Sequence, residues 1–520
     1  MATTNRSVAE VPKRVRAGRH VAALLACLGA SSAFAQQWGM DLGLASQLTW
    51  TSNSSFGVAA GGQEDTVFEL RPHLRLHGEG ARLRLSGTAS VAGIAYANGT
   101  QPNLLEPTAD LSARLEAIER LFFLEAGYRA AQTSQNPFGA RPDSAFTANT
   151  LTASQWRFSP VIEGAAGSGL RYRLRSDNTW TREIGASDLA VAPDAGGGYF
   201  GRHAASIERD PQPFGWHLEA ERALTRYNDP AQTSVSIETA RLILSYALGE
   251  DWSAGLRAGY ERNNIESVEQ RRRSIYGVEA RWRPSPRTTL SAFHEKRFFG
   301  SGWNLAFDHR RPQLALSMLF SRGIDTTPQA FLDLPATDNV AGLLDAAFTT
   351  RYPDPIERAR VVQDYISRQG LPSATFGPLS LFAPRFSLVT ERRASVTLLG
   401  SRNSLTLSGF STRTEDAIDL GPLATGAAAT NNVQYGASVV LSHRLNPLTG
   451  LSVTLDWSRI RALDMLVPDE STQRGVRVQT SLRVAPLTST FFGGRYRKIE
   501  SNVAIQGREG AVFAGLDHRF

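Results

Sequence analysis

Residues 170–180 read LRYRLRSDNTW, and this stretch decides the class of fold. Apolar residues alternate with arginines along it: Leu170, Arg171, Tyr172, Arg173, Leu174 and Arg175. A two-residue period is that of a β-strand whose two faces meet different surroundings. Lipid on one face and a water-filled lumen on the other produce this pattern.

The same alternation continues from residue 38 to the end of the chain, in segments of about ten to fifteen residues. These segments number about 22, with a range of 18–24, and short connections such as 78–80 alternate with long ones such as 133–148. Residues 298–312 fit least well, because Gly300 and Ser301 leave little room for a loop. We predict an all-β fold, a transmembrane antiparallel β-barrel in the outer membrane of a Gram-negative cell. A soluble β-sandwich or propeller is the alternative, which the lack of a repeat of about 40 to 50 residues disfavours.

The first 35 residues have the features of a secretory signal peptide. Basic residues precede an apolar run, and the small residues after it place cleavage between Ala35 and Gln36. The barrel is then expected to occupy residues 36–520, reaching the outer membrane through the Sec pathway and the periplasm. Cys27 is the one cysteine and lies in this leader, where a lipoprotein box is the less favoured alternative.

Charge and hydropathy exclude several classes of protein. The formal net charge of +7 falls to 7 − 4 = +3 when the five basic and one acidic side chains of the leader are removed. That balance argues against nucleic acid as a partner. After the leader, no stretch stays apolar for the ~20 residues that a membrane helix needs.

The C-terminal residues indicate which partners the protein meets during its assembly. The chain ends on an alternating segment with Phe520, which resembles the signal by which the barrel assembly machinery recognises outer-membrane proteins, although His518 departs from that pattern. Expected partners are therefore this machinery, outer-membrane lipids and lipopolysaccharide. A polysaccharide or another anionic solute is a further candidate.

Residues 323–387 break the strand pattern, and loop parity places them on the extracellular side. Within them, a capping residue, a helix-favouring Pro355 and an apolar face predict a helix over about 355–369. The residues that mark it are Asp354, Ile356, Glu357, Val362, Tyr365 and Ile366. The segment is either a plug inside the lumen or a cap on neighbouring loops, and the width of a large barrel favours the plug.

Arginines on the polar face of the segments are candidates for lining the lumen. They are Arg82, Arg84, Arg171, Arg173, Arg175, Arg281, Arg283, Arg477 and Arg495. Because arginine binds carboxylates and phosphates with two hydrogen bonds, these residues would favour anions in a pore. Carboxylates on the same face, such as Glu125 and Glu279, favour the alternative of a self-paired structural network.

We find no motif for catalysis. A phosphate-binding loop with its lysine, a His-Glu-x-x-His pair and a Gly-x-Ser-x-Gly elbow are missing from the sequence after the leader. Asp308, His309 and Arg310 form the one conceivable catalytic cluster. We expect no enzyme activity, no cofactor and no metal site.

Five segments carry a resemblance to a known family. They are Gly259–Asn264, WRPSPRTTL at 282–290, FFGSGWNLAFDHRR at 298–311, Asp354–Ser373 and Ser442–Pro447. In them the chain resembles an uncharacterised family of outer-membrane β-barrel proteins associated with the PEP-CTERM/exosortase sorting system and its exopolysaccharide loci. The resemblance implies a role linked to extracellular polysaccharide or surface sorting, and it brings no catalytic residues.

Three functions compete on this basis. The first is a passive or gated channel, including a conduit for exopolysaccharide. The second is a structural or assembly protein whose lumen is filled, and the third is an enzyme in the barrel wall. We disfavour an energised transporter with an N-terminal plug domain, because the first predicted strand begins within a few residues of the expected cleavage point.

Overall fold

The structure is a computed structural model. It describes residues 37–56, 62–134, 136–141, 149–167, 169–184, 197–228, 234–265, 271–326, 340–349, 351–369, 371, 377–379, 386–417, 431–463, 468–502 and 506–520. The predicted leader and its cleavage point, Ala35 and Gln36, lie outside these residues.

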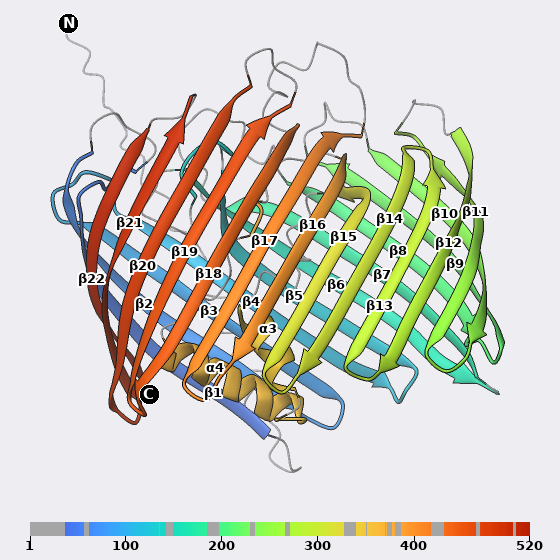
Figure 1. Cartoon of the computed structure of the whole chain (residues 1–520), viewed down its shortest axis with the longest axis horizontal. Coiled ribbons are helices and arrows are strands. Elements are labelled where there is room, and N and C mark those ends of the chain that lie inside the picture. The colour runs from blue at the N-terminus through green and yellow to red at the C-terminus, as the bar shows by residue number, and fades with distance from the viewer. Residues whose placement is uncertain are drawn as a thin grey trace, which may run out of the picture.

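The described chain forms one closed sheet of 22 antiparallel strands, which confirms the predicted barrel and its strand number (Figure 1). Each strand pairs with the next, and β1 also pairs with β22 to close the ring. The strands are β1 (Gln37–Thr51), β2 (Asp65–Glu79), β3 (Leu83–Tyr96), β4 (Leu104–Ile118), β5 (Phe122–Ser134), β6 (Thr150–Ala166), β7 (Leu170–Ile184), β8 (Gly198–Arg209), β9 (Phe214–Tyr227), β10 (Val235–Leu248), β11 (Trp252–Asn263), β12 (Arg271–Ser285), β13 (Thr288–Arg297), β14 (Gly300–Arg311), β15 (Leu314–Thr326), β16 (Phe386–Leu399), β17 (Asn403–Asp416), β18 (Asn432–Asn446), β19 (Thr449–Ala462), β20 (Glu470–Ala485), β21 (Thr488–Ser501) and β22 (Gly507–Arg519). Closure leaves no free sheet edge, as a membrane requires.

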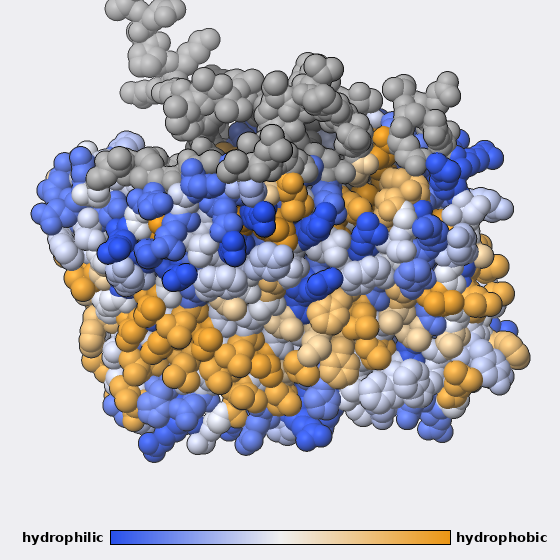
Figure 2. All heavy atoms as spheres, turned by 45° about the horizontal axis from the view of Figure 1, so that its top comes forward, coloured by the Kyte–Doolittle hydropathy of each residue, from blue (hydrophilic) through white to orange (hydrophobic). Residues whose placement is uncertain are grey.

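The two faces of the wall differ in chemistry. In β1, Trp38, Met40 and Leu42 are exposed on the outer face, while Asp41 and Gln47 lie on the lumen face. Figure 2 shows the resulting apolar band on the outside, with a polar band above it. All nine tryptophans lie on the outer face of their strands: Trp38, Trp50, Trp156, Trp180, Trp216, Trp252, Trp282, Trp303 and Trp457.

The lengths of the connections between strands show which rim of the barrel faces the periplasm and which faces the cell surface. Short turns such as 80–82, 312–313 and 400–402 gather at one rim, and the long connections gather at the other. Short turns face the periplasm in outer-membrane barrels, so the long connections face the cell surface. With its apolar outer band, the protein is an outer-membrane β-barrel of the Gram-negative type.

The region that fitted the pattern least well contains a tight hairpin. β13 ends at Arg297 and β14 begins at Gly300, so two residues connect them. Gly300 has a φ of 100°, a conformation that glycine adopts at low cost because it lacks a Cβ atom. Surface connections in this barrel can therefore be very short.

The insertion between β15 and β16 holds two helices, α3 (Val340–Phe348) and α4 (Pro355–Gln369). The predicted helix corresponds to α4, but α3 is an element that the sequence analysis missed. The insertion leaves and rejoins the wall at the cell-surface rim, yet both helices lie inside the barrel near the periplasmic rim (Figure 1). Within the described residues, no helix is long and apolar enough to cross a membrane.

Candidate functional site: a lumen occupied at two levels

The helices α3 and α4 form a hairpin whose ends are fixed by polar contacts. Asp354 caps α4, since its Oδ1 accepts a hydrogen bond of 2.7 Å from the backbone N–H of Glu357. Pro355 follows at the first helical position, where it costs no hydrogen bond. Arg358 then joins the helices through a 2.7 Å ion pair with Asp345 of α3 and donates to the carbonyl of Tyr352.

An apolar cluster fastens this hairpin to the lumen wall. Its buried residues are Ala315, Val340, Leu344, Ala347, Phe348, Val362, Leu371, Leu399 and Val440. Of these, Ala315, Leu399 and Val440 are lumen-facing wall residues of β15, β16 and β18. The burial of apolar surface against small wall side chains therefore holds the hairpin in place.

Polar contacts extend the attachment along the wall. The Tyr365 hydroxyl lies 3.4 Å from Ser442 Oγ, and Asp364 lies 3.6 Å from a guanidinium nitrogen of Arg519 in β22. The main contacts of the hairpin are thus with β14–β16 and β18–β20, on one side of the barrel. It narrows the periplasmic mouth from that side.

The predicted helix residues fall as follows. Val362 is buried, Tyr365 and Ile366 pack against the cluster, and Asp354 and Glu357 are exposed. The side chain of Ile356 lies outside what the structure describes. Ala359 is exposed, so α4 contacts the wall over a narrow stripe of its surface.

A second level lies near the cell-surface rim, where the connection between β5 and β6 reaches the opposite wall. Phe138 packs on Ile460 and Ala462 of β19, and Ala140 packs with Ile499 of β21. Strands β5 and β19 are far apart around the ring, so this connection crosses the mouth rather than lying over its own strands.

Arg141 links this connection to the inserted segment. Its guanidinium donates a 2.7 Å hydrogen bond to the carbonyl of Gly377, and its backbone N–H donates to Gln473 Oε1 at 3.3 Å. Gln473 in turn donates to the carbonyl of Gly139 at 2.8 Å.

Gln434 holds the returning part of the insertion in a similar way. It accepts from the backbone N–H of Leu379 at 2.8 Å and donates to its carbonyl at 3.2 Å. Sequence reasoning missed Arg141, Gln434 and Gln473. The available signal was that both glutamines stand at lumen-facing positions of their strands, opposite loops that need backbone partners.

The lumen face of β9–β13 carries dense ion pairs. Glu295 of β13 is almost fully buried, and three guanidinium groups reach its carboxylate. Arg241 lies at 3.0 Å, Arg257 at 3.3 Å and Arg297 at 3.4 Å. Further carboxylates, among them Glu279 at 2.7 Å from Arg257, balance these cations.

A second network lies on β4–β8. Glu125 and Glu163 each bind two arginines, with Arg114 shared between them and Arg175 and Arg173 at the outer ends. Asp210 lies in the short turn after β8, and it accepts two 2.6 Å hydrogen bonds from the guanidinium of Arg171 on β7. The Arg171 guanidinium holds the pKa of the Asp210 carboxyl below its usual value.

The predicted lumen arginines are placed as follows. Arg84, Arg171, Arg173, Arg175, Arg281, Arg283, Arg477 and Arg495 lie on the lumen face of their strands, and Arg82 lies in a periplasmic turn. Several have carboxylate partners, for example Arg495 with the buried Glu509 at 2.8 Å. These arginines are therefore interleaved with carboxylates rather than forming one continuous cationic ladder.

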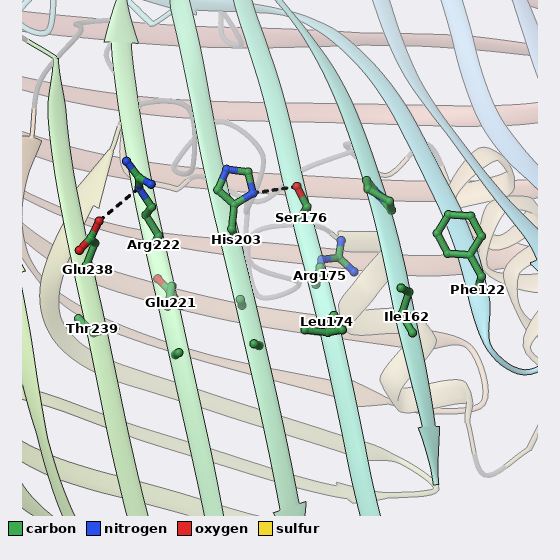
Figure 3. A pocket seen from close by; sticks show the side chains of 14 residues that line it. Phe122, Ile162, Leu174, Arg175, Ser176, His203, Glu221, Arg222, Glu238 and Thr239 are labelled. Atoms are coloured by element: carbon green, nitrogen blue, oxygen red, sulfur yellow. Dashed lines mark hydrogen bonds and ion pairs between the residues drawn. The ribbon is translucent and has the colours of Figure 1, made fainter.

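The outer face also carries polar side chains, in a row across β7–β10 (Figure 3). Ser176 Oγ lies 2.8 Å from His203 Nδ1, and Arg222 lies 3.4 Å from Glu238. Glu238 also pairs with Arg262 at 3.2 Å. The carboxylate in this row is thus shared by two cations.

The conceivable catalytic cluster is not assembled. Asp308 points into the lumen, where Ser317 donates to it at 2.8 Å, whereas His309 lies on the opposite face of β14 beside Thr288. Among the described residues, no group of three or more His, Cys, Asp or Glu side chains could hold a metal ion.

No family model matches the chain, and no curated protein does either. Among solved structures, it is similar to the ferric enterobactin receptor PfeA of Pseudomonas aeruginosa, with 11% identity over 93% of this chain and 81% of that one and a TM-score of 0.42. It is also similar to the siderophore receptor PirA of Acinetobacter baumannii, with 9% identity, 93% and 81% coverage and a TM-score of 0.47. The FrpB iron transporter of Neisseria meningitidis gives 8% identity, 92% and 82% coverage and a TM-score of 0.45.

Proposed function

We propose that this protein is a channel for hydrophilic solutes whose periplasmic mouth is narrowed by the α3–α4 hairpin. The observation that carries the proposal is the place of the hairpin, inside the barrel and fastened to one side of its wall by an apolar cluster. The polar wall on β4–β8, across the barrel from the hairpin, borders the space that the hairpin leaves. Solutes would pass between these two surfaces.

The way in which the hairpin is attached would allow it to move out of the periplasmic mouth. It is connected to the wall by noncovalent contacts and by chain that returns to the cell-surface rim, so it can leave the mouth without unfolding a strand. A barrel of this strand number without internal filling would leave a wide aqueous opening. The hairpin and the β5–β6 connection would therefore set the size of solute that passes.

The class of solute is a further part of the proposal. The resemblance in five segments favours exopolysaccharide or another product of the same loci. Arginines and carboxylates are interleaved along the lumen face, so hydrogen-bonding groups of both charges would line the passage of a polar solute. Because all nine tryptophans face lipid, a sugar chain would be bound by hydrogen bonds and by Phe or Tyr rings rather than by tryptophan stacking.

A filled, non-conducting barrel is the second candidate, and the buried ion pairs around Glu295 favour it. Single-channel recording in planar bilayers separates the two. We expect small conductance for the intact protein and a clear increase for a variant lacking residues 335–380. A variant lacking residues 186–195, in the connection after β7, is the matched control and should conduct like the intact protein.

The outcomes exclude one another. If the intact protein conducts and the deletion of residues 335–380 leaves the conductance unchanged, the hairpin does not narrow the passage and the proposal fails. If neither the intact protein nor the deletion variant conducts while both are folded, the filled barrel is correct.

A further inference from the structure

The outer wall carries a cationic hollow at the upper limit of the apolar band, on β16–β19. Its volume is about 490 Å³, and its polar lining includes Thr390, Arg392, Ser411, Arg413, Tyr435 and Arg461. Register places these residues on the outer face, because they alternate with lumen-facing residues such as Glu391 and Thr412. The hollow therefore faces the membrane and not the channel.

The height of this hollow corresponds to the headgroups of the outer leaflet. Arg461 is one residue from the surface end of β19, and Arg413 is three residues from the surface end of β17. Directly toward the periplasm, the same outer faces turn apolar, with Leu407, Val439 and Leu455 in one cross-strand row. The polar band above the apolar band is visible in Figure 2.

Two of the three arginines have no partner of their own. Arg413 pairs with Glu415 at 2.7 Å, but Arg392 and Arg461 form no ion pair with any described residue, and both are exposed. The polar row on β7–β10 differs in this respect, since Arg222 of that row and Arg262 of β11 share Glu238. The hollow on β16–β19 thus has an excess of positive charge where lipid is its neighbour.

We propose that this hollow binds a phosphate of lipid A, the anionic lipid of the outer leaflet. Guanidinium groups bind phosphate with two parallel hydrogen bonds, and Arg392 and Arg461 approach the hollow from strands on either side of β17 and β18. Thr390, Ser411 and Tyr435 supply hydroxyl donors beside them. The apolar faces of β17–β19 below would contact the acyl chains.

The test measures lipid binding by the purified full barrel in nonionic detergent. Bisphosphorylated hexa-acyl lipid A is titrated, and thermal unfolding and native mass spectrometry report its binding. We expect saturable binding to the wild type and about a tenfold or larger loss of affinity in the Arg392→Gln/Arg461→Gln double variant, because two charge-assisted hydrogen-bonding groups are removed. Arg209→Gln, which removes an arginine from the periplasmic end of the outer face of β8, is the matched control and should bind like the wild type.

Three further measurements keep the proposal falsifiable. Monophosphoryl lipid A should bind less tightly, and Arg392→Lys/Arg461→Lys should retain part of the affinity, since charge remains while the paired hydrogen bonds are lost. Equal protection by inorganic phosphate or by phosphatidylglycerol vesicles would show a site for any anion and overturn the assignment. Equal affinity in the double variant and the wild type would also overturn it.

Discussion

At the scale of the residue, Glu295 shows how much the stability of the lumen wall depends on each buried charge having an ion-pair partner. Three arginines surround a carboxylate that is almost fully buried. Glu295→Ala should lower the free energy of unfolding by about 3 kcal/mol, because it leaves buried cations without their shared partner. Arg84→Ala, which breaks an exposed pair with Glu79, should cost no more than about 1 kcal/mol. Urea unfolding in micelles, followed by tryptophan fluorescence, measures both changes, and equal losses would contradict this reasoning.

At this scale, the sequence predicts on which face of the wall a side chain lies, but it does not predict which residues that side chain contacts. Alternation places Arg257 on the lumen side of β11, yet its contact with Glu295 joins strands that are two apart and depends on register. The same limit applies to Arg141, since no local pattern shows that a loop residue will meet Gly377 across the mouth.

At the scale of the element, the hairpin should respond to a single charge in its apolar cluster. Leu344 of α3 is buried against the wall, so Leu344→Asp would place a carboxylate without a partner in an apolar site. We expect the single-channel conductance to rise toward that of the variant lacking residues 335–380. Ala359→Asp adds the same charge at an exposed position of α4 and should leave the conductance unchanged. A rise in both variants would show that charge, and not detachment, alters the current.

The two helices also show what the sequence could predict about elements. Asp354, Pro355 and Glu357 form a start signal for α4 that needs no tertiary context. Helix α3 has nine residues, contains a glycine and has no acidic residue in its first turn, so packing against the wall stabilises it rather than its own pattern. Its position near the periplasm could not be predicted, because loop parity gives the rim to which a segment is attached and not the depth that it reaches.

At the scale of the whole molecule, interleaved charges predict weak ion selectivity. Arginines on the lumen face of β4–β13 are paired with carboxylates, so the wall presents little net field to a passing ion. The reversal potential in a KCl gradient should lie close to zero. Glu125→Gln/Glu163→Gln leaves Arg114 and Arg173 without their carboxylate partners, while Arg175 keeps Asp177, and it should shift the reversal potential toward anion preference. Strong anion preference in the unaltered protein would contradict this account.

The barrel itself was predictable because its physical cause repeats in every strand. Lipid and water select alternate side chains, and the alternation of short and long connections fixes strand number and orientation. The tight hairpin at Gly300 was the weakest part of that prediction, since it interrupts the pattern of long surface loops. The interior could not be predicted in the same way, because its contacts join segments that lie far apart in the chain.

The path of the insertion has a mechanical consequence. Both of its ends are attached at the cell surface, at Thr326 and Phe386, while the helices that it carries lie at the periplasmic rim. The hairpin is therefore held at the inner rim by its apolar cluster, while its covalent attachment lies at the other rim. Release of that cluster would thus open the inner mouth while the barrel still retained the hairpin, ready to return to the same place.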